Sequence, residues 1–244
     1  MGKKIRVQRR GRGSPTFQAA THKRVAPSRY LPLHPAAEDE SNHAVVEALL
    51  HEPGRGAPLL QARADAGVFH VVAPEGVAVG QDLHFGVNAP VATGNVLPLS
   101  AIPSGTYVSN LELAPGDGGK IAKASGTYAL VVAQTPEGIQ VRLPSKRTVY
   151  LHPRCRATIG VVAGAGRTIK PFGKAGKRAA WLAAKGKIYP RSKGVAMVPA
   201  AHPHGGGAHS SSSLRPTTVS RTAPPGQKVG LIAARQSGRK KRGR

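Results

Sequence analysis

The chain has 244 residues, of which 36 are Lys or Arg and 11 are Asp or Glu, and its formal net charge is +25. Small soluble domains more often carry a net charge within about eight units of zero, so the excess indicates a polyanionic partner. Aromatic residues make up only 4% of the chain, which excludes a bulky aromatic core. The sequence has one cysteine and no apolar run near eighteen residues. These features exclude an intrachain disulfide and predict no membrane span, and we expect a soluble, cytoplasmic protein.

The charges are segregated along the sequence. Residues 1–34 contain nine Lys and Arg and no acid, whereas residues 35–140 contain all eleven acids and only four Lys and Arg. Residues 141–244 contain twenty-three Lys and Arg and again no acid. Blocks of like charge repel one another, so the two ends need counterions from outside the segment. A phosphate backbone supplies such counterions at high density.

The first segment, 1–34, is expected to be a basic extension. Residues 9–16 (RRGRGSPT) show neither a helical nor a strand period. A disordered tail is one interpretation, since such arms commonly order only on their partner. The other is an extended arm that follows RNA, with glycines allowing close backbone approach and arginines bridging phosphates.

The second segment, 35–98, changes to short β-like runs that end at Gly and Pro turn signals. The expected strands cover residues 43–52, 58–63 and 68–73. The first run also has helical propensity, but the Gly and Pro that follow it favour strands. We expect a small antiparallel barrel here, in which Arg55 lies between two glycines and is the best RNA-contacting candidate.

The third segment, 99–173, repeats this character and predicts a second small barrel. Such evenly spaced strands without long helices between them are typical of small β barrels. The expected strands cover residues 107–113, 121–124, 128–133, 139–143, 148–151 and 157–163.

The fourth segment, 174–244, is expected to be a basic C-terminal extension with one short helix over residues 174–185 (KAGKRAAWLAAK). Lysines and arginines surround Trp181 there, and without acids they repel one another at helical spacing. A solvated basic face is the plainer alternative, but RNA phosphate would relieve the repulsion. The tail at 239–244 fits RNA binding or a nuclear-localisation run equally well.

Several strings resemble one family, the universal large-subunit ribosomal protein family called L-two, in its archaeal and eukaryotic form. They follow the family order and span almost the whole chain. The strings are QRRGRGS (8–14), HEPGRGAPL (51–59), GNVLPL (94–99), PGD (115–117), ASGTYA (124–129), KGVAM (193–197), HPHGGG (202–207) and VGLIAAR (229–235).

The resemblance implies a mainly β fold, with an OB-like barrel followed by an SH3-like barrel and two extensions embedded in large-subunit rRNA. It also implies a place near the peptidyl-transferase region, neighbouring ribosomal proteins, and roles in subunit association and tRNA placement. The sequence departs from the family at Val198, where Asn is usual, and at Ala201, where an acid usually precedes the histidine. A role for His202 that depends on a carboxylate partner is weakened accordingly.

The string HPHGGG allows three interpretations. His202, His204 and His209 offer metal ligands, but their spacing is not a standard zinc pattern and no acid or Cys is near. A catalytic role lacks a nucleophile and an orienting acid. We favour a loop on RNA, in which glycines let backbone N–H groups reach phosphate and imidazoles contact bases or 2′-hydroxyls.

Other candidate sites favour plain interpretations. Cys155 lies between arginines that would lower its pKa, but no His partner is visible, so we expect a small side chain at a barrel turn. The glycines at 11–13 and 164–166 lack the strand–glycine–helix context of nucleotide-binding loops. We therefore expect no cofactor, no metal, no small-molecule substrate and no enzymatic activity.

The predicted function is that of a structural, rRNA-binding component of the large ribosomal subunit. The alternative is a free nucleic-acid-binding factor that uses the same arms outside the ribosome. The predicted rRNA-binding residues are Arg9, Arg10, Arg12, Lys23, Arg24, Arg55, Arg167, Lys174, Lys177, Arg178, Trp181, Lys187, Arg191, Lys193, His202, His204, Gly205, Gly206, Gly207, Arg221, Lys228 and Arg235.

Overall fold

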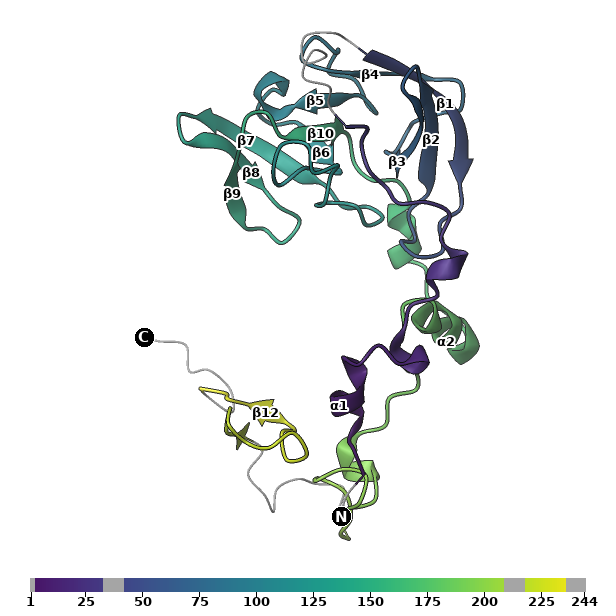
Figure 1. The fold of residues 1–244 in the computed structure, drawn as a ribbon, viewed down its shortest axis with the longest axis vertical. Helices are drawn as coiled ribbons and strands as arrows, with labels where there is room; N and C mark the ends of the chain where they lie inside the picture. The colour runs from purple at the N-terminus through teal and green to yellow at the C-terminus, as the bar shows by residue number, and fades with distance from the viewer. Residues whose placement is uncertain (1–2, 33–41, 209–217, 236–244) are drawn as a thin grey trace. The chain divides into compact units, whose positions relative to one another are not determined.

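The computed structural model describes residues 3–32, 42–208 and 218–235 (Figure 1). The chain divides into two compact units. One, which we call the β unit, covers Thr21–Pro171, and the other, which we call the terminal unit, joins Met1–Ala20 to Phe172–Arg244. The first and last parts of the sequence therefore fold together, and each unit is described separately below.

The β unit is a ten-stranded sheet with the order β3-β2-β1-β4-β5-β10-β6-β7-β8-β9. All neighbouring strands pair antiparallel except β4 and β5, which meet in parallel at Phe85 and Val96. The elements are η2 (Thr21–Lys23), β1 (Asn42–Leu50), β2 (Leu59–Ala64), β3 (Gly67–Val72), β4 (Asp82–Phe85), β5 (Val96–Pro98), η4 (Leu99–Ala101), β6 (Tyr107–Ser109), β7 (Ala129–Thr135), β8 (Gly138–Arg142), β9 (Thr148–Leu151), β10 (Arg156–Ile159) and η5 (Ala165–Thr168).

Two main hydrophobic clusters hold the sheet together. The first lies on β1–β4, where alternate residues such as Ala44, Val46 and Ala62 are buried. The second lies on β6–β10 and includes Val131 and Val141. Burying one such aliphatic side chain contributes about 1.5–3 kcal/mol, so many small residues replace the missing aromatic ones. The mainly β class predicted from the sequence is confirmed. One hydrophobic cluster lies on the earlier strands, β1–β4, and the other on the later strands, β6–β10.

Several predicted strand boundaries were wrong. The run 121–124 forms no strand, and only an isolated bridge joins Ile121 to Leu111. The run 107–113 is a strand for three residues only, because Asn110 turns the backbone to a positive φ of 47°. The strands β4 and β5 were not predicted.

A strap of residues 25–32 lies on the β unit and is fixed at Tyr30. The Tyr30 hydroxyl donates to the Asn110 carbonyl at 2.7 Å and lies 2.6 Å from the Thr158 hydroxyl. The Tyr30 backbone N–H donates to the Gly118 carbonyl at 3.1 Å. Burial raises the pKa of the Tyr30 phenol, so this group stays a hydrogen-bond donor. These bonds fix the strap to the β unit.

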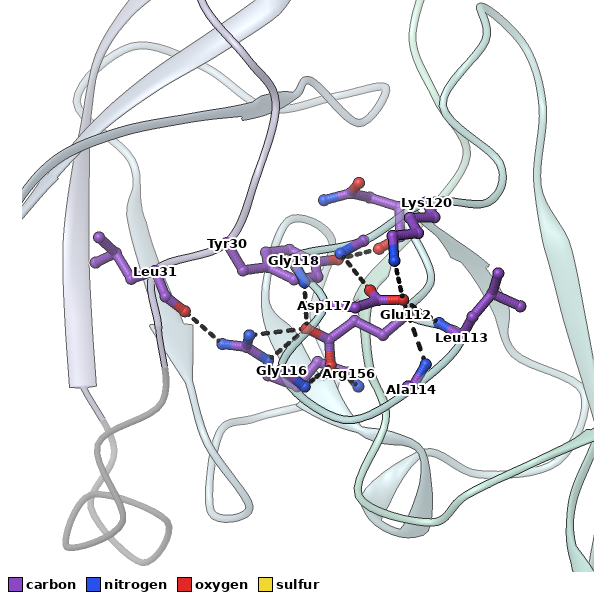
Figure 2. Close-up of polar contacts among 12 residues, drawn as sticks. Tyr30, Leu31, Glu112, Leu113, Ala114, Gly116, Asp117, Gly118, Lys120 and Arg156 are labelled. Atoms are coloured by element: carbon purple, nitrogen blue, oxygen red, sulfur yellow. Dashed lines mark hydrogen bonds and ion pairs between the residues drawn. The ribbon is translucent and has the colours of Figure 1, made fainter.

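A buried ion pair lies beside Tyr30 (Figure 2). The Glu112 carboxylate accepts hydrogen bonds from the Arg156 side chain at 2.8 and 3.2 Å and from the Arg156 backbone N–H at 2.9 Å. Arg156 in turn donates to the Leu31 carbonyl at 2.9 Å, and its guanidinium lies 5.1 Å from the Tyr30 ring centre. One acid and one base from distant segments thus fasten the strap to β10.

The terminal unit contains short elements joined by irregular chain. They are α1 (Arg6–Arg10), η1 (Pro15–Phe17), α2 (Ala175–Ala183), η6 (Gly194–Ala196), β11 (Thr218–Val219) and β12 (Leu231–Ile232). The predicted helix over 174–185 is confirmed as α2. The expectation of a purely irregular opening segment was wrong, because α1 includes Arg9 and Arg10 and the Gln8 side chain accepts the Ile5 N–H at 3.0 Å.

The two sequence ends of the terminal unit touch at specific backbone atoms. The Lys3 N–H donates to the Ala200 carbonyl at 2.7 Å. Gly186 has a φ of 64°, and a Cβ there would lie 2.5 Å from the Phe17 carbonyl oxygen. Close approach therefore requires glycine at this position. Within the described residues, no helix is long and apolar enough to cross a membrane.

Candidate nucleic-acid interface

The turn between β1 and β2 presents Arg55 on a rigid base. Glu52 is buried, and its carboxylate accepts the Val25 N–H at 3.0 Å and the Gly54 N–H at 3.1 Å. The Gly56 N–H closes the turn on the Glu52 carbonyl at 3.3 Å. Because its oxygens already accept these bonds, Glu52 shapes the turn as well as attracting Arg55. The sequence HEPGRG therefore encodes a fixed platform for one guanidinium.

The Arg55 guanidinium is poorly compensated. Among the residues that the structure describes, its Nη1 atom is buried without any hydrogen-bond partner. Burial lowers the pKa of Arg55 most, the Glu52 charge opposes that shift, and the Arg24 charge adds to it. A buried donor without an acceptor costs free energy. The nearby positive charge of Arg24 adds to the cost, and an anion bound near the two arginines would offset their repulsion.

Lys123 joins the same group of cations from the loop before β7. Its Nζ donates to the Ser28 carbonyl at 2.6 Å and to the Gly119 carbonyl at 2.8 Å. The pKa of Lys123 falls to about 8, through burial first and then through the charges of Arg55 and Arg29. Neither Lys123 nor Arg29 was among the predicted site residues. No motif in the sequence around Lys123 or Arg29 indicates a site, and these residues approach Arg55 only in the folded chain.

Arg167, which was predicted, lies against the same turn. Its Nε and Nη2 donate to the Ser125 hydroxyl at 3.2 and 2.8 Å. Gly56 has a φ of 76°, and a Cβ there would lie 2.8 Å from the Arg167 guanidinium carbon. Glycine is therefore needed both for the turn and for this contact. We call Arg24, Arg29, Arg55, Lys123 and Arg167 the cation cluster.

Three ion pairs of the β unit lie outside the cation cluster, whereas Glu52 offsets part of the charge of Arg55 within it. Glu112 is paired with Arg156, Asp117 lies 3.3 Å from Lys120, and Glu47 is paired with Arg63. Backbone N–H groups of residues 113, 114 and 119 bind the Asp117 carboxylate and lower its pKa against the effect of burial (Figure 2). Opposite charges at these three sites offset one another. The excess positive charge of the β unit therefore lies at other positions, including the cation cluster.

In the terminal unit, α2 stacks cations on aromatic rings. The Lys185 ammonium lies 3.9 Å from the Trp181 ring centre, and the Arg178 guanidinium lies 5.4 Å from that of Tyr189. Phe172 contacts Trp181 with ring centres 5.6 Å apart. Cation–π contact offsets repulsion between the like charges. Lys177 on α2 and Lys174 at its N-cap are exposed and remain available to an anion.

The HPHGGG loop is packed on its own chain. The His202 Nδ1 accepts the His204 N–H at 3.1 Å, and the two rings meet edge to face at 5.1 Å. The Gly205 and Gly206 N–H groups donate to the His202 and Met197 carbonyls at 2.9 and 3.0 Å. These N–H groups are therefore occupied, which differs from the phosphate contact expected from the sequence.

Of the other predicted residues, Arg10, Arg191 and Lys193 line one pocket together with His202, and the rest are not gathered into a site. All are exposed or partly exposed. They are Arg9, Arg10, Arg12, Lys23, Lys187, Arg191, Lys193, Arg221, Lys228 and Arg235.

The described residues hold no group of three or more His, Cys, Asp or Glu side chains that could bind a metal ion. His209, the third histidine of the zinc alternative, lies outside the described residues, as does the basic run at 239–244. Cys155 is buried, and burial raises the pKa of its thiol to about 11. The thiol is therefore protonated at neutral pH, as expected for a structural cysteine.

The fold and the site define a class: a mainly β protein whose positive charge is concentrated on surfaces without internal counterions. Comparison with known proteins specifies it further. Residues 92–223 match the family model described as Ribosomal Proteins L2, C-terminal domain. The chain belongs to the family of large ribosomal subunit protein uL2.

Three relatives illustrate the match, each named Large ribosomal subunit protein uL2. The protein of Korarchaeum cryptofilum is 51% identical over 243 residues, covering 99% of this chain and 98% of the relative. That of Desulfurococcus amylolyticus is 49% identical, covering 99% and 100%. That of Pyrobaculum calidifontis is 51% identical, covering 98% and 96%. The resemblance to the L-two family inferred from the sequence strings is confirmed.

Proposed function

We propose that this chain is a structural, non-enzymatic component of the large ribosomal subunit in the cytoplasm, where it binds large-subunit rRNA. Full-length similarity to proteins named as large-subunit proteins supports the ribosomal assignment. The cation cluster supports the mechanism, because Arg24, Arg55 and Lys123 lie close enough for their positive charges to oppose one another, and a phosphate backbone would offset that repulsion. That single observation carries the proposal of rRNA binding.

The mechanism follows from the two kinds of basic surface. Within the cation cluster, hydrogen bonds hold the side chains of Lys123 and Arg167 in place before RNA arrives, so these two side chains lose little freedom on binding. The terminal unit contributes many exposed Lys and Arg that neutralise neighbouring phosphates as they approach. The protein thereby bridges RNA segments that would otherwise repel one another, which assists assembly of the subunit.

The finer parts of the proposal rest on the family resemblance. They are a position near the peptidyl-transferase region, neighbouring ribosomal proteins as partners, and support of subunit association and tRNA placement. The fourfold division into 1–34, 35–98, 99–173 and 174–244, with an OB-like and an SH3-like barrel, belongs to the same group. We include the predicted surface residues as rRNA contacts on the same ground.

A salt titration tests rRNA binding. The affinity of the purified full chain for folded large-subunit rRNA is measured from about 50 to 300 mM salt. We expect the logarithm of the binding constant to fall linearly with the logarithm of salt, with a slope of several units in magnitude. A flat dependence would contradict binding through phosphates. Sedimentation of a low-salt lysate separates the alternative, since a free nucleic-acid-binding factor would remain mainly in the soluble fractions.

A further inference from the structure

A pocket in the terminal unit has no place in the function described so far. Its volume is about 420 Å³, within the range of about 300–1,000 Å³ that is common for small-ligand sites. One wall comes from the opening segment, including Ile5 and Val7, and the other from the later segment, including Met197 and Ala201. The pocket therefore depends on the contact between the two ends of the sequence.

Hydrogen bonds hold both walls. The Lys3 N–H donates to the Ala200 carbonyl at 2.7 Å, and the buried Ile5 is capped by Gln8 at 3.0 Å. On the other side, the Gly206 N–H fixes the Met197 carbonyl at 3.0 Å. Two backbone bonds and one bond to the Gln8 side chain thus position the apolar lining.

The rim of the pocket is cationic. Arg6, Arg10, Arg191 and Lys193 line it, and neither stretch of the terminal unit contains any Asp or Glu. An apolar floor with a purely positive rim suits a ligand that has a flat apolar part and a negative part. A bare phosphate would leave the apolar walls unused.

His202 adds one hydrogen-bond donor to the wall. Because its Nδ1 accepts the His204 N–H, the neutral ring carries its proton on Nε2. Burial, and then the neighbouring His204, lower the pKa of His202, which keeps the ring neutral at pH 7. Gly194 permits this placement, since a Cβ there would lie 2.3 Å from the ring.

We propose that this pocket binds one unpaired nucleobase of an RNA strand. The base inserts between Ile5 and Met197, its flanking phosphates lie on the cationic rim, and the His202 Nε2–H donates to a base or ribose oxygen. An unstacked base is held in a protein pocket by hydrogen bonds to its edge and by contact with aromatic or apolar side chains, and neutralisation of its phosphates adds to the affinity. This inference rests on the proposed rRNA-binding function and adds a specific site to it.

The first test compares two small probes on the full chain. Adenosine 5′-monophosphate and ribose 5-phosphate carry the same phosphate, but only the first carries a base. We expect the methyl NMR signals of Ile5, Met197 and Ala201 to shift saturably with the nucleotide, which binds about tenfold or more tighter than the sugar phosphate. Equal shifts with both probes would overturn the proposal. Larger shifts with a short polyglutamate peptide would overturn it in favour of an acidic protein partner.

A matched pair of variants gives the second test. Ala201→Leu fills the pocket, whereas Ala196→Leu makes the same change on an exposed residue that does not line it. We expect Ala201→Leu to lose most of the preference for single-stranded over duplex RNA of equal length, while Ala196→Leu keeps it. Equal behaviour of the two variants would overturn the proposal.

Duplex RNA separates this proposal from the proposed function. We expect both variants to retain the wild-type affinity for duplex RNA, because duplex binding depends on phosphates. Failure of the unaltered chain to bind any RNA would contradict the proposed function. Intact duplex binding without a nucleotide preference would contradict the pocket alone.

Discussion

The β unit and the terminal unit use charge in different ways. The β unit contains all eleven acids of the chain and pairs several of them, as in the buried contact between Glu112 and Arg156. The terminal unit contains six Lys and Arg from 1 to 20, sixteen from 172 to 244, and no acid. Its buried apolar residues are few, with Ile5 and Val229 the examples among those described.

The difference shows two solutions to binding a polyanion. The β unit folds with its own counterions and core, and it can therefore hold a small cation cluster at an energetic cost. The terminal unit cannot neutralise itself, so its stability and its affinity for RNA are linked through the same charges. Substitutions should accordingly separate stability from binding in the first unit and change both together in the second.

The largest effect is expected at the buried ion pair. Glu112→Gln leaves Arg156 charged and buried without its carboxylate, which should lower the free energy of unfolding by about 3–5 kcal/mol. Urea unfolding followed by far-UV circular dichroism measures this. Glu137→Gln, on an exposed turn, is the matched control and should behave as the unaltered chain. Equal stability of the two variants would refute the internal-counterion account.

Arg55 tests the separation of stability from binding. Arg55→Met keeps an unbranched stem and removes the unpartnered guanidinium. We expect the free protein to gain roughly 1 kcal/mol of stability and its rRNA affinity to fall roughly tenfold to a hundredfold. Arg63→Met, which removes an exposed arginine paired with Glu47, serves as the control for net charge. A loss of stability in Arg55→Met would contradict the account of a poorly compensated cation.

The sequence predicts those parts of the fold and of the site that depend on residues close together in the chain, and it misses contacts between distant segments. Turn signals such as PGRG and the apolar residues of β1 and β2 act locally, and they predicted these two strands correctly. The role of Arg55 in binding rRNA stays a prediction. Lys123 and Arg29 were missed because their closeness to Arg55 is a product of the fold. Likewise, the backbone contacts that occupy the Gly205 and Gly206 N–H groups have no local signal.

Lys123 should make rRNA binding depend on pH. Its pKa of about 8 lies below the usual value of 10.5, so between these values the unfolded chain binds more protons than the folded one. Stability of the free protein should therefore rise with pH across this window. Affinity for rRNA should fall a few-fold over the same range, because the neutral amine no longer attracts phosphate. Measuring the rRNA affinity at pH 7 and pH 9 tests this. In Lys123→Met, the change in affinity between the two pH values should be smaller by the part that Lys123 contributes.

The smallest effect is expected in the HPHGGG loop, where two glycines differ. A Cβ on Gly205 would lie 2.3 Å from the Met197 carbonyl, which is itself held by the Gly206 N–H, whereas a Cβ on Gly207 meets nothing within 4 Å. We expect Gly205→Ala to lower rRNA affinity about threefold to tenfold through distortion of the loop. Gly207→Ala should change it by no more than about twofold, since its only cost is backbone strain at a φ of 87°. If the two variants bind equally weakly, the glycines act through contact with RNA, and the contrast between self-packing and open loop positions fails.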